Sequence, residues 1–279
     1  MTKTKFVKEN YKRIKIKGKT VNFDDNLHHN LQEVKDMINL KFDGVVLFDG
    51  MEGSGKSELA MQTCLVMDKS FSDADVFYSV EQFEEWLDNA KPGKAGCWDE
   101  FVLAGLSTDA LTKLQGIIIK KFTMIRKKAL YIALVIPYIF MLRKYFAVAR
   151  TRCLVHVYAI GKQRGYFRFY TYSQKTWIFN YGHKTWLYSD KVIPAFQGKF
   201  EAWSLDFLDD DKIQAKKDEA LRTLGDEDNS IKLTPKVIEY MVIGNCLNNT
   251  FDRVEQKKEY NLINKLQVKL SQMPLPNNI

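Results

Sequence analysis

The chain has 279 residues, of which 46% are hydrophobic and 27% are charged, and its formal net charge is +8. This composition supplies a core for one domain of ordinary size with appendages. It excludes a membrane span, because the longest apolar run, Ala129–Leu142, has 14 residues and contains Pro137. The N-terminus has no apolar signal region, and four scattered cysteines form no C-x-x-C pair (Cys64, Cys97, Cys153 and Cys246). We therefore expect a cytoplasmic protein with reduced thiols.

The positive charge is concentrated at the start of the chain. Residues 1–19 carry eight basic side chains and one acidic side chain, Glu9. Such a basic arm can bind a polyanion through counterion release, and a solvated tail is the alternative. We predict DNA contacts at four residues of this arm, Lys12, Arg13, Lys15 and Lys17. We divide the chain into a basic N-terminal arm (1–40), a central core (41–205) and a helical C-terminal region (206–279).

The pattern G-x-x-x-x-G-K-[ST], the phosphate-binding P-loop, occurs once, between a predicted strand at Val45–Phe48 and a predicted helix at Glu58–Met67. Its residues are Gly50, Met51, Glu52, Gly53, Ser54, Gly55, Lys56 and Ser57. Glycines let backbone N–H groups curl around phosphate oxygens, and the following helix adds a partial positive charge. Lys56 is expected to reach the β- and γ-phosphates, and Ser57 to bind Mg²⁺. A chance match in a glycine turn is the alternative, but the flanking strand and helix favour binding of ATP with Mg²⁺.

An acidic pair follows further along the chain. After a predicted strand at Asp75–Ser79 and a predicted helix at Val80–Asn89, the residues Ala95-Gly96-Cys97 lead to Trp98-Asp99-Glu100, where Asp99 is expected to end a core strand. Asp99 is expected to hold Mg²⁺ through water, and Glu100 to polarise the attacking water as general base. The pair favours an ATPase over a small-molecule kinase or a GTPase. A solvated acidic pair at the start of a loop is the alternative.

The remaining elements continue this alternation and then change character. Apolar patterning predicts the helix Thr108–Lys128, the strand Leu130–Ile136, the helix Phe140–Val148 and the strand Cys153–Ala159. A hairpin turn at Gly161–Gly165 precedes predicted antiparallel strands at Tyr166–Tyr172, Thr176–Asn180 and Thr185–Tyr188. From Asp206 onward the chain is polar and helical. The predicted fold class is α/β, with a mainly parallel sheet flanked by helices, an antiparallel hairpin extension and a helical C-terminal tail.

This layout resembles the RecA-like branch of the additional-strand P-loop ATPases, and within it the HerA/FtsK group of DNA-pumping motors. The resemblance rests on Gly50–Ser57, on Asp99-Glu100, and on Arg126–Lys128 leading into Leu130–Pro137. It covers roughly residues 41–200. It implies a homo-oligomeric ring, usually a hexamer, with ATP between subunits and an arginine donated by the neighbour. Arg126 is the first candidate for that arginine, and Arg150 and Arg152 are alternatives.

The resemblance further implies an ATP-hydrolysing motor that moves DNA, packaging a viral genome or transferring mobile-element DNA. A capsid or portal component would then be a partner, and no membrane is expected. One departure concerns the tip of the fourth strand, where the group usually has a polar γ-phosphate sensor. Here the tip reads Val135–Tyr138, and only Tyr138 is polar. A nucleotide-gated assembly or morphogenesis ATPase and a small-molecule kinase remain as alternatives.

Overall fold

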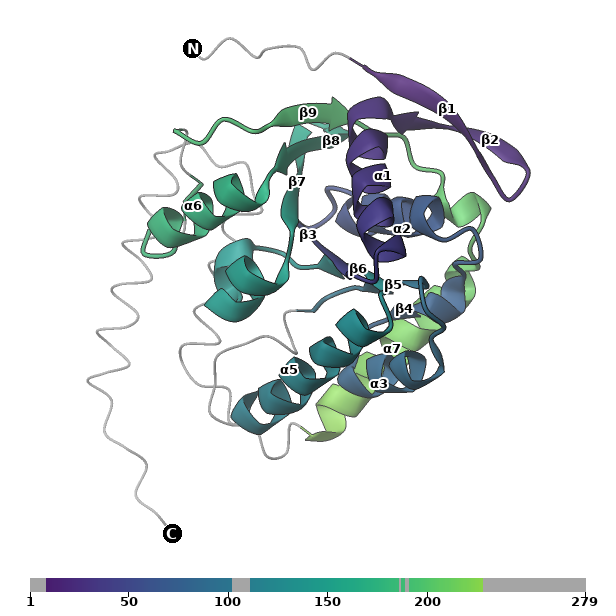
Figure 1. Ribbon diagram of the computed structural model, residues 1–279, viewed down its shortest axis with the longest axis vertical. Coiled ribbons are helices and arrows are strands. Elements are labelled where there is room, and N and C mark those ends of the chain that lie inside the picture. The colour runs from purple at the N-terminus through teal and green to yellow at the C-terminus, as the bar shows by residue number, and fades with distance from the viewer. Residues whose placement is uncertain (1–8, 102–110, 186, 189–190, 228–279) are drawn as a thin grey trace. The chain divides into compact units, whose positions relative to one another are not determined.

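The computed structural model describes residues 9–101, 111–185, 187–188 and 191–227 (Figure 1). Residues 108–110 of the predicted helix Thr108–Lys128, Cys246 and the chain after Glu227 lie outside this range. Cys64, Cys97 and Cys153 are buried free thiols. Among the described helices, none combines the length and apolar character that a bilayer span requires.

A seven-stranded sheet forms the centre of the fold, in the order β4-β5-β6-β3-β7-β8-β9. The strands are β3 (Gly44–Gly50), β4 (Val76–Phe77), β5 (Ala95–Trp98), β6 (Tyr131–Val135), β7 (Cys153–Ile160), β8 (Gln163–Tyr170) and β9 (Phe196–Lys199). Neighbours from β4 to β7 pair in parallel, and β8 and β9 extend the sheet in antiparallel fashion. The predicted α/β class, with its parallel sheet and antiparallel extension, is confirmed.

Helices cover both faces of this sheet (Figure 1). They are α1 (Asp25–Asn39), α2 (Lys56–Met67), α3 (Val80–Asn89), α5 (Leu111–Lys127), α6 (Tyr172–Gly182) and α7 (Asp210–Glu227). Strand β3 is buried along its whole length, and its side chains alternate between two cores. Val46 and Phe48 pack in the core that includes α1 and α2. Val45 and Leu47 pack in the core that includes α3, α5 and α6.

The basic N-terminal region contains folded elements that the sequence analysis did not predict. Strands β1 (Tyr11–Ile16) and β2 (Lys19–Asp24) form an antiparallel hairpin that leads into α1. Ile16, Val21 and Phe23 are buried in the core of the domain. The predicted DNA-binding side chains Lys12, Arg13, Lys15 and Lys17 are exposed along the hairpin. Two of them also have partners inside the chain, since Lys12 pairs with Asp25 at 3.8 Å and Lys17 donates to the Phe71 carbonyl at 2.7 Å.

The predicted strand at Thr176–Asn180 is wrong, because these residues belong to helix α6. Its buried residues are Lys175, Ile178, Phe179 and Gly182, which is the spacing of one helix face. Thr171 and Gln174 form a capping box that starts the helix. The described residues of Thr185–Tyr188 form no strand either, and the outer strand of the extension is β9.

The predicted helix at Phe140–Val148 is also different in the structure. A short 3-10 helix at Ile139–Met141 and a π-helix at Tyr145–Arg150 take its place. The π-helix is fixed by the buried ammonium group of Lys175, which donates to the carbonyl oxygens of Ala147, Val148 and Thr151 at 2.7–2.9 Å. A lysine from another helix therefore satisfies carbonyls at the C-terminal end of the π-helix, where a helix leaves its carbonyls without an internal partner.

Candidate functional site

The residues Gly50–Ser57, called here the glycine loop, join the end of β3 to the start of α2. Gly50, Gly53 and Gly55 have φ angles of 139°, 69° and 97°, a region that side chains with a Cβ rarely adopt. At Gly50 a Cβ would lie 1.8 Å from the carbonyl oxygen of Val157 on the neighbouring strand. This loop conformation therefore requires glycine at its first position.

The loop presents hydrogen-bond donors that the described protein leaves unused. Helix α2 has Gly55 at its N-cap and no side-chain cap, so its first N–H groups have no partner within the helix. The hydroxyl of Ser54 is buried and has no hydrogen-bond partner among the described residues. Unpaired buried donors are costly, and the N-terminus of a helix favours a negative charge. An anion with several acceptor oxygens would satisfy both features.

The side chain of Lys56 folds back over the glycine loop. Its ammonium group donates to the carbonyl oxygen of Met51 at 2.9 Å. Burial lowers the pKa of Lys56, and the carboxylates of Asp99 and Asp49 act in the opposite direction. A second negative group beside this lysine would stabilise its charged form further.

Asp99 lies at the end of β5 and is 7% exposed. The hydroxyl of Ser57 lies near its carboxylate. Burial raises the pKa of Asp99, the nearby Ser57 hydroxyl lowers it, and the neighbouring charge of Glu100 raises it again. The structure thus brings together the two residues that the sequence analysis assigned to Mg²⁺. Ser57 follows β3 and Asp99 follows β5, and β6 lies between these two strands in the sheet.

Glu100 follows with a left-handed backbone, at φ 56°. Its N–H donates to Asp99 Oδ1 at 3.0 Å, and its side chain is 41% exposed. Its Oε1 lies 2.6 Å from the Nζ of Lys217, on helix α7. The sequence analysis missed Lys217, since nothing in the local pattern of a polar helix marks one lysine among several.

The three candidate arginines lie at the other end of the sheet. Arg150 pairs with Asp43 and donates to the Phe122 carbonyl, and Arg152 donates to the Asp43 carbonyl at 2.7 Å. Asp43 precedes β3, whose seven residues span roughly 20 Å before the glycine loop begins. Arg126 is exposed at the end of α5, just before β6 starts at the same edge. None of these arginines lies beside the glycine loop of its own subunit, and two of them are used within the fold.

The tip of β6 contacts the start of the glycine loop. The carbonyl oxygen of Pro137 accepts a hydrogen bond from the N–H of Gly50 at 3.2 Å. Tyr138, the only polar residue of this tip, is half-buried, and its ring packs against Phe140 and Tyr188. Burial and the charge of Asp49 raise the pKa of Tyr138. A role for Tyr138 as γ-phosphate sensor stays a prediction.

A second cation near the loop also escaped the sequence analysis. Arg164, at the start of β8, lies with its guanidinium carbon 3.8 Å from the position of a Cβ on Gly53. The hairpin of β7 and β8, with its turn at Gly161-Lys162, carries this residue to the carboxyl edge of β3. The sequence analysis recognised the hairpin turn but not its position over the loop.

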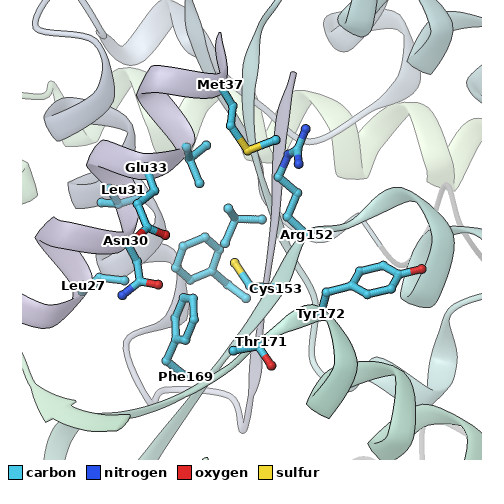
Figure 2. Close-up of a pocket in the computed structure, with 13 residues that line it drawn as sticks. Leu27, Asn30, Leu31, Glu33, Met37, Arg152, Cys153, Phe169, Thr171 and Tyr172 are labelled. Atoms are coloured by element: carbon cyan, nitrogen blue, oxygen red, sulfur yellow. The ribbon is translucent and has the colours of Figure 1, made fainter. Parts of the chain in front are cut away.

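A cavity of about 210 Å³ lies elsewhere, between helix α1 and the sheet. In Figure 2, side chains of α1 face Cys153 and Phe169 of the sheet across this space. None of its lining residues belongs to the glycine loop or to the acidic pair. Within the described ranges, no group of three or more His, Cys, Asp and Glu side chains is arranged to hold a metal ion. The glycine loop with Asp99 and Glu100 is therefore the candidate site.

No protein-family model matches this chain, and a search of the curated proteins finds no match to it either.

Proposed function

We propose that the protein is an ATPase that binds ATP with Mg²⁺ on the glycine loop. The observation that carries the proposal is the proximity of the Ser57 hydroxyl to the buried carboxylate of Asp99, directly beside an uncapped helix N-terminus. A buried carboxylate is unfavourable unless a cation or donors offset its charge. A serine hydroxyl and a carboxylate are oxygen ligands, which Mg²⁺ prefers.

In this proposal each group of site residues has its own role. The loop N–H groups, the Ser54 hydroxyl and the Lys56 ammonium group bind the phosphates. Ser57 and Asp99 hold Mg²⁺, which neutralises charge on the phosphate oxygens. Glu100 orients a water molecule and accepts its proton. The partial exposure of Glu100 leaves its carboxylate accessible to that water.

The strand order supports a RecA-like P-loop fold of the additional-strand type. Strand β6 lies between β3, which carries the glycine loop, and β5, which carries the acidic pair. An additional strand at this position is what the resemblance to the HerA/FtsK group implies. We extend the proposal to a motor that moves DNA as a ring, usually a hexamer, with a viral genome or mobile-element DNA as cargo and a capsid or portal component as partner.

Two features of the described surface support the extension to DNA. The hairpin of β1 and β2 carries exposed lysines and an arginine on a folded, core-anchored element rather than on a free tail. Basic side chains on a rigid element bind a phosphate backbone through counterion release. Arg126 is exposed and free to serve a neighbouring subunit, whereas Arg150 and Arg152 are paired within their own.

The test is equilibrium binding of a fluorescent ATP analogue in Mg²⁺, together with ATP hydrolysis with and without DNA. Lys56→Ala should weaken nucleotide binding by about 10–100-fold, since it removes the charged donor of the loop. Lys91→Ala, in an exposed turn, is the matched control and should bind like the wild type. Unchanged binding in Lys56→Ala would remove the loop from the nucleotide site. ATP hydrolysis that DNA does not stimulate would support the ATPase assignment but contradict the extension to a DNA motor.

A further inference from the structure

Helix α7 is anchored firmly beside the acidic pair. Ile213 and Ala220 of α7 are 3% and 4% exposed. The ammonium group of Lys216 donates to the carbonyl oxygens of Asp73, Ala74 and Val76 at 3.0–3.1 Å, where the chain enters and forms β4. The next residue, Lys217, is thereby held at a fixed position relative to β5, the neighbour of β4.

The two adjacent lysines serve different purposes. Lys216 bonds backbone carbonyls, which fixes the helix. Lys217 instead points its ammonium group at Glu100, at 2.6 Å, and lies 5.9 Å from the centre of the Tyr78 ring. Partial burial disfavours its charge, but the Glu100 hydrogen bond and the charges of Glu100, Asp99 and Glu52 raise the pKa of Lys217. Glu52 belongs to the glycine loop, so the charge of Lys217 interacts with the loop as well as with the acidic pair.

We propose that Lys217 is a γ-phosphate-binding residue, supplied by the C-terminal helix of the same subunit, that exchanges Glu100 for the terminal phosphate of bound ATP. The proposal rests on the proposed function. A terminal phosphate carries more negative charge than one carboxylate and offers three acceptor oxygens, so it competes for the ammonium group. A diphosphate has no γ-phosphate and leaves the Lys217–Glu100 pair intact.

The exchange has a consequence for Glu100. While Lys217 holds it, the carboxylate is paired and oriented towards α7. Once the ammonium group turns to the phosphate, Glu100 is released to accept a proton from water. The proton acceptor thus becomes available when the γ-phosphate is present. Lys217 would then sense the γ-phosphate. The tip of β6, Val135–Tyr138, offers only a tyrosine for that role.

The test compares the affinities for Mg²⁺-ATPγS and Mg²⁺-ADP, measured by competition with a fluorescent nucleotide. The wild type should prefer the triphosphate, and Lys217→Ala should lose about 10-fold of that preference with little change in ADP affinity. Lys217→Arg should keep most of the preference. Lys212→Ala is the matched control, because Lys212 lies on the same helix and, among the residues that the structure describes, pairs only with Asp209 and Asp73. ADP affinity reports whether each variant is folded.

A double-mutant cycle separates phosphate binding from simple charge repulsion. Glu100→Gln frees Lys217, so it should raise the preference for ATPγS more in the wild-type background than in Lys217→Ala. An equal gain in both backgrounds, or a preference unchanged by Lys217→Ala, would overturn the proposal while leaving the ATPase assignment in place. A wild-type protein that binds neither nucleotide would instead overturn the proposed function, and the role of Lys217 with it.

Discussion

The carboxylate of Asp49 lies 2.9 Å from Nδ1 of His156. Asp49 is the residue directly before the glycine loop. The same fully buried carboxylate accepts a hydrogen bond from the N–H of Ile139 at 3.0 Å and contacts the hydroxyl of Tyr188. These partners come from β7, from the segment after β6 and from the segment after α6. Asp49 therefore ties the start of the loop to three other parts of the domain.

Removing this carboxylate should destabilise the domain. Asp49→Ala leaves the Ile139 N–H and the Tyr188 hydroxyl without their acceptor, and a buried unpaired polar group costs about 1–3 kcal/mol. Urea unfolding followed by circular dichroism measures the loss. Asp88→Ala, on the exposed side of α3, is the control and should change the free energy of unfolding by less than about 0.5 kcal/mol. Equal stability of the two variants would show that Asp49 does not fix the loop.

Glu100→Gln should separate binding from hydrolysis. Glutamine keeps the size of the side chain but cannot accept a proton from water, so turnover should fall by about 10²-fold or more. Nucleotide affinity should not fall, because the loop donors and Lys56 are untouched. Steady-state phosphate release and equilibrium binding on the same preparation give both numbers. Wild-type turnover in this variant would assign the proton acceptor to another residue.

Gly50→Ala should disrupt the glycine loop more than any surface change. The added Cβ would lie 1.8 Å from the Val157 carbonyl oxygen, and the φ angle of 139° is strained for alanine. We expect loss of nucleotide binding together with a lower melting temperature. Gly93→Ala is the matched control, since Gly93 also has a positive φ angle, 80°, but no atom lies within 4 Å of its added Cβ. Nucleotide binding that survives in Gly50→Ala would contradict the observed approach of β3 to β7.

Asp24 should make stability depend on pH. Its Oδ1 caps α1 by accepting from the N–H of Leu27 at 2.9 Å, while its Oδ2 is buried without a partner among the described residues. Burial raises the pKa of Asp24 from 3.8 to about 6. The folded state therefore favours the protonated acid, so the contribution of Asp24 is full below pH 4 and is lost as the pH rises through 6.

Asp24→Asn tests this sign. The amide keeps an acceptor for the Leu27 N–H but cannot ionise. Relative to the wild type, the variant should gain up to about 2–3 kcal/mol of stability between pH 4 and pH 6, with no further change above that range. Thermal melts of both proteins from pH 4 to pH 8 measure the difference. A constant difference across the range would mean that Asp24 is ionised in the folded protein throughout.

The role of Arg126 is tested by mixing subunits. If a neighbour supplies this arginine, Arg126→Ala and Glu100→Gln subunits are each inactive, but a mixed ring contains some complete sites. Mixing the two should therefore raise ATP hydrolysis above the sum of the separate preparations. Activity strictly proportional to composition would indicate sites that are complete within one subunit. Measuring the particle mass of the same samples establishes whether mixed rings form.

The parallel part of the sheet could be predicted because its strands are short, continuous apolar runs. Leu130–Ile136 contains no polar side chain apart from the hydroxyl of Tyr131, and the structure places β6 within it. Helix α3 was predicted with its observed bounds, Val80–Asn89, between a predicted strand and a predicted proline turn, and in the structure Ser79 caps it. Local sequence was sufficient where burial on both faces or a clear cap determined the element.

Aromatic content misled the prediction of α6. Trp177, Ile178 and Phe179 favour a strand by propensity, yet the buried spacing and the capping box decide for a helix. In the site, Lys56, Ser57, Asp99 and Glu100 were found because a motif or a strand end marks each of them. Asp49 and Lys217 were not, because their partners, His156 and Glu100, are adjacent only in three dimensions.

The left-handed backbone of Glu100 bears on how this protein can evolve. Holding a non-glycine residue at a φ angle of 56° costs about 1 kcal/mol, a cost that glycine would avoid. Variation that is screened only for a robust fold would drift to glycine at this position. If Glu100 is the proton acceptor that we propose, an acid persists there only under continuous selection for the reaction, and stabilised versions of the chain would lose catalysis first.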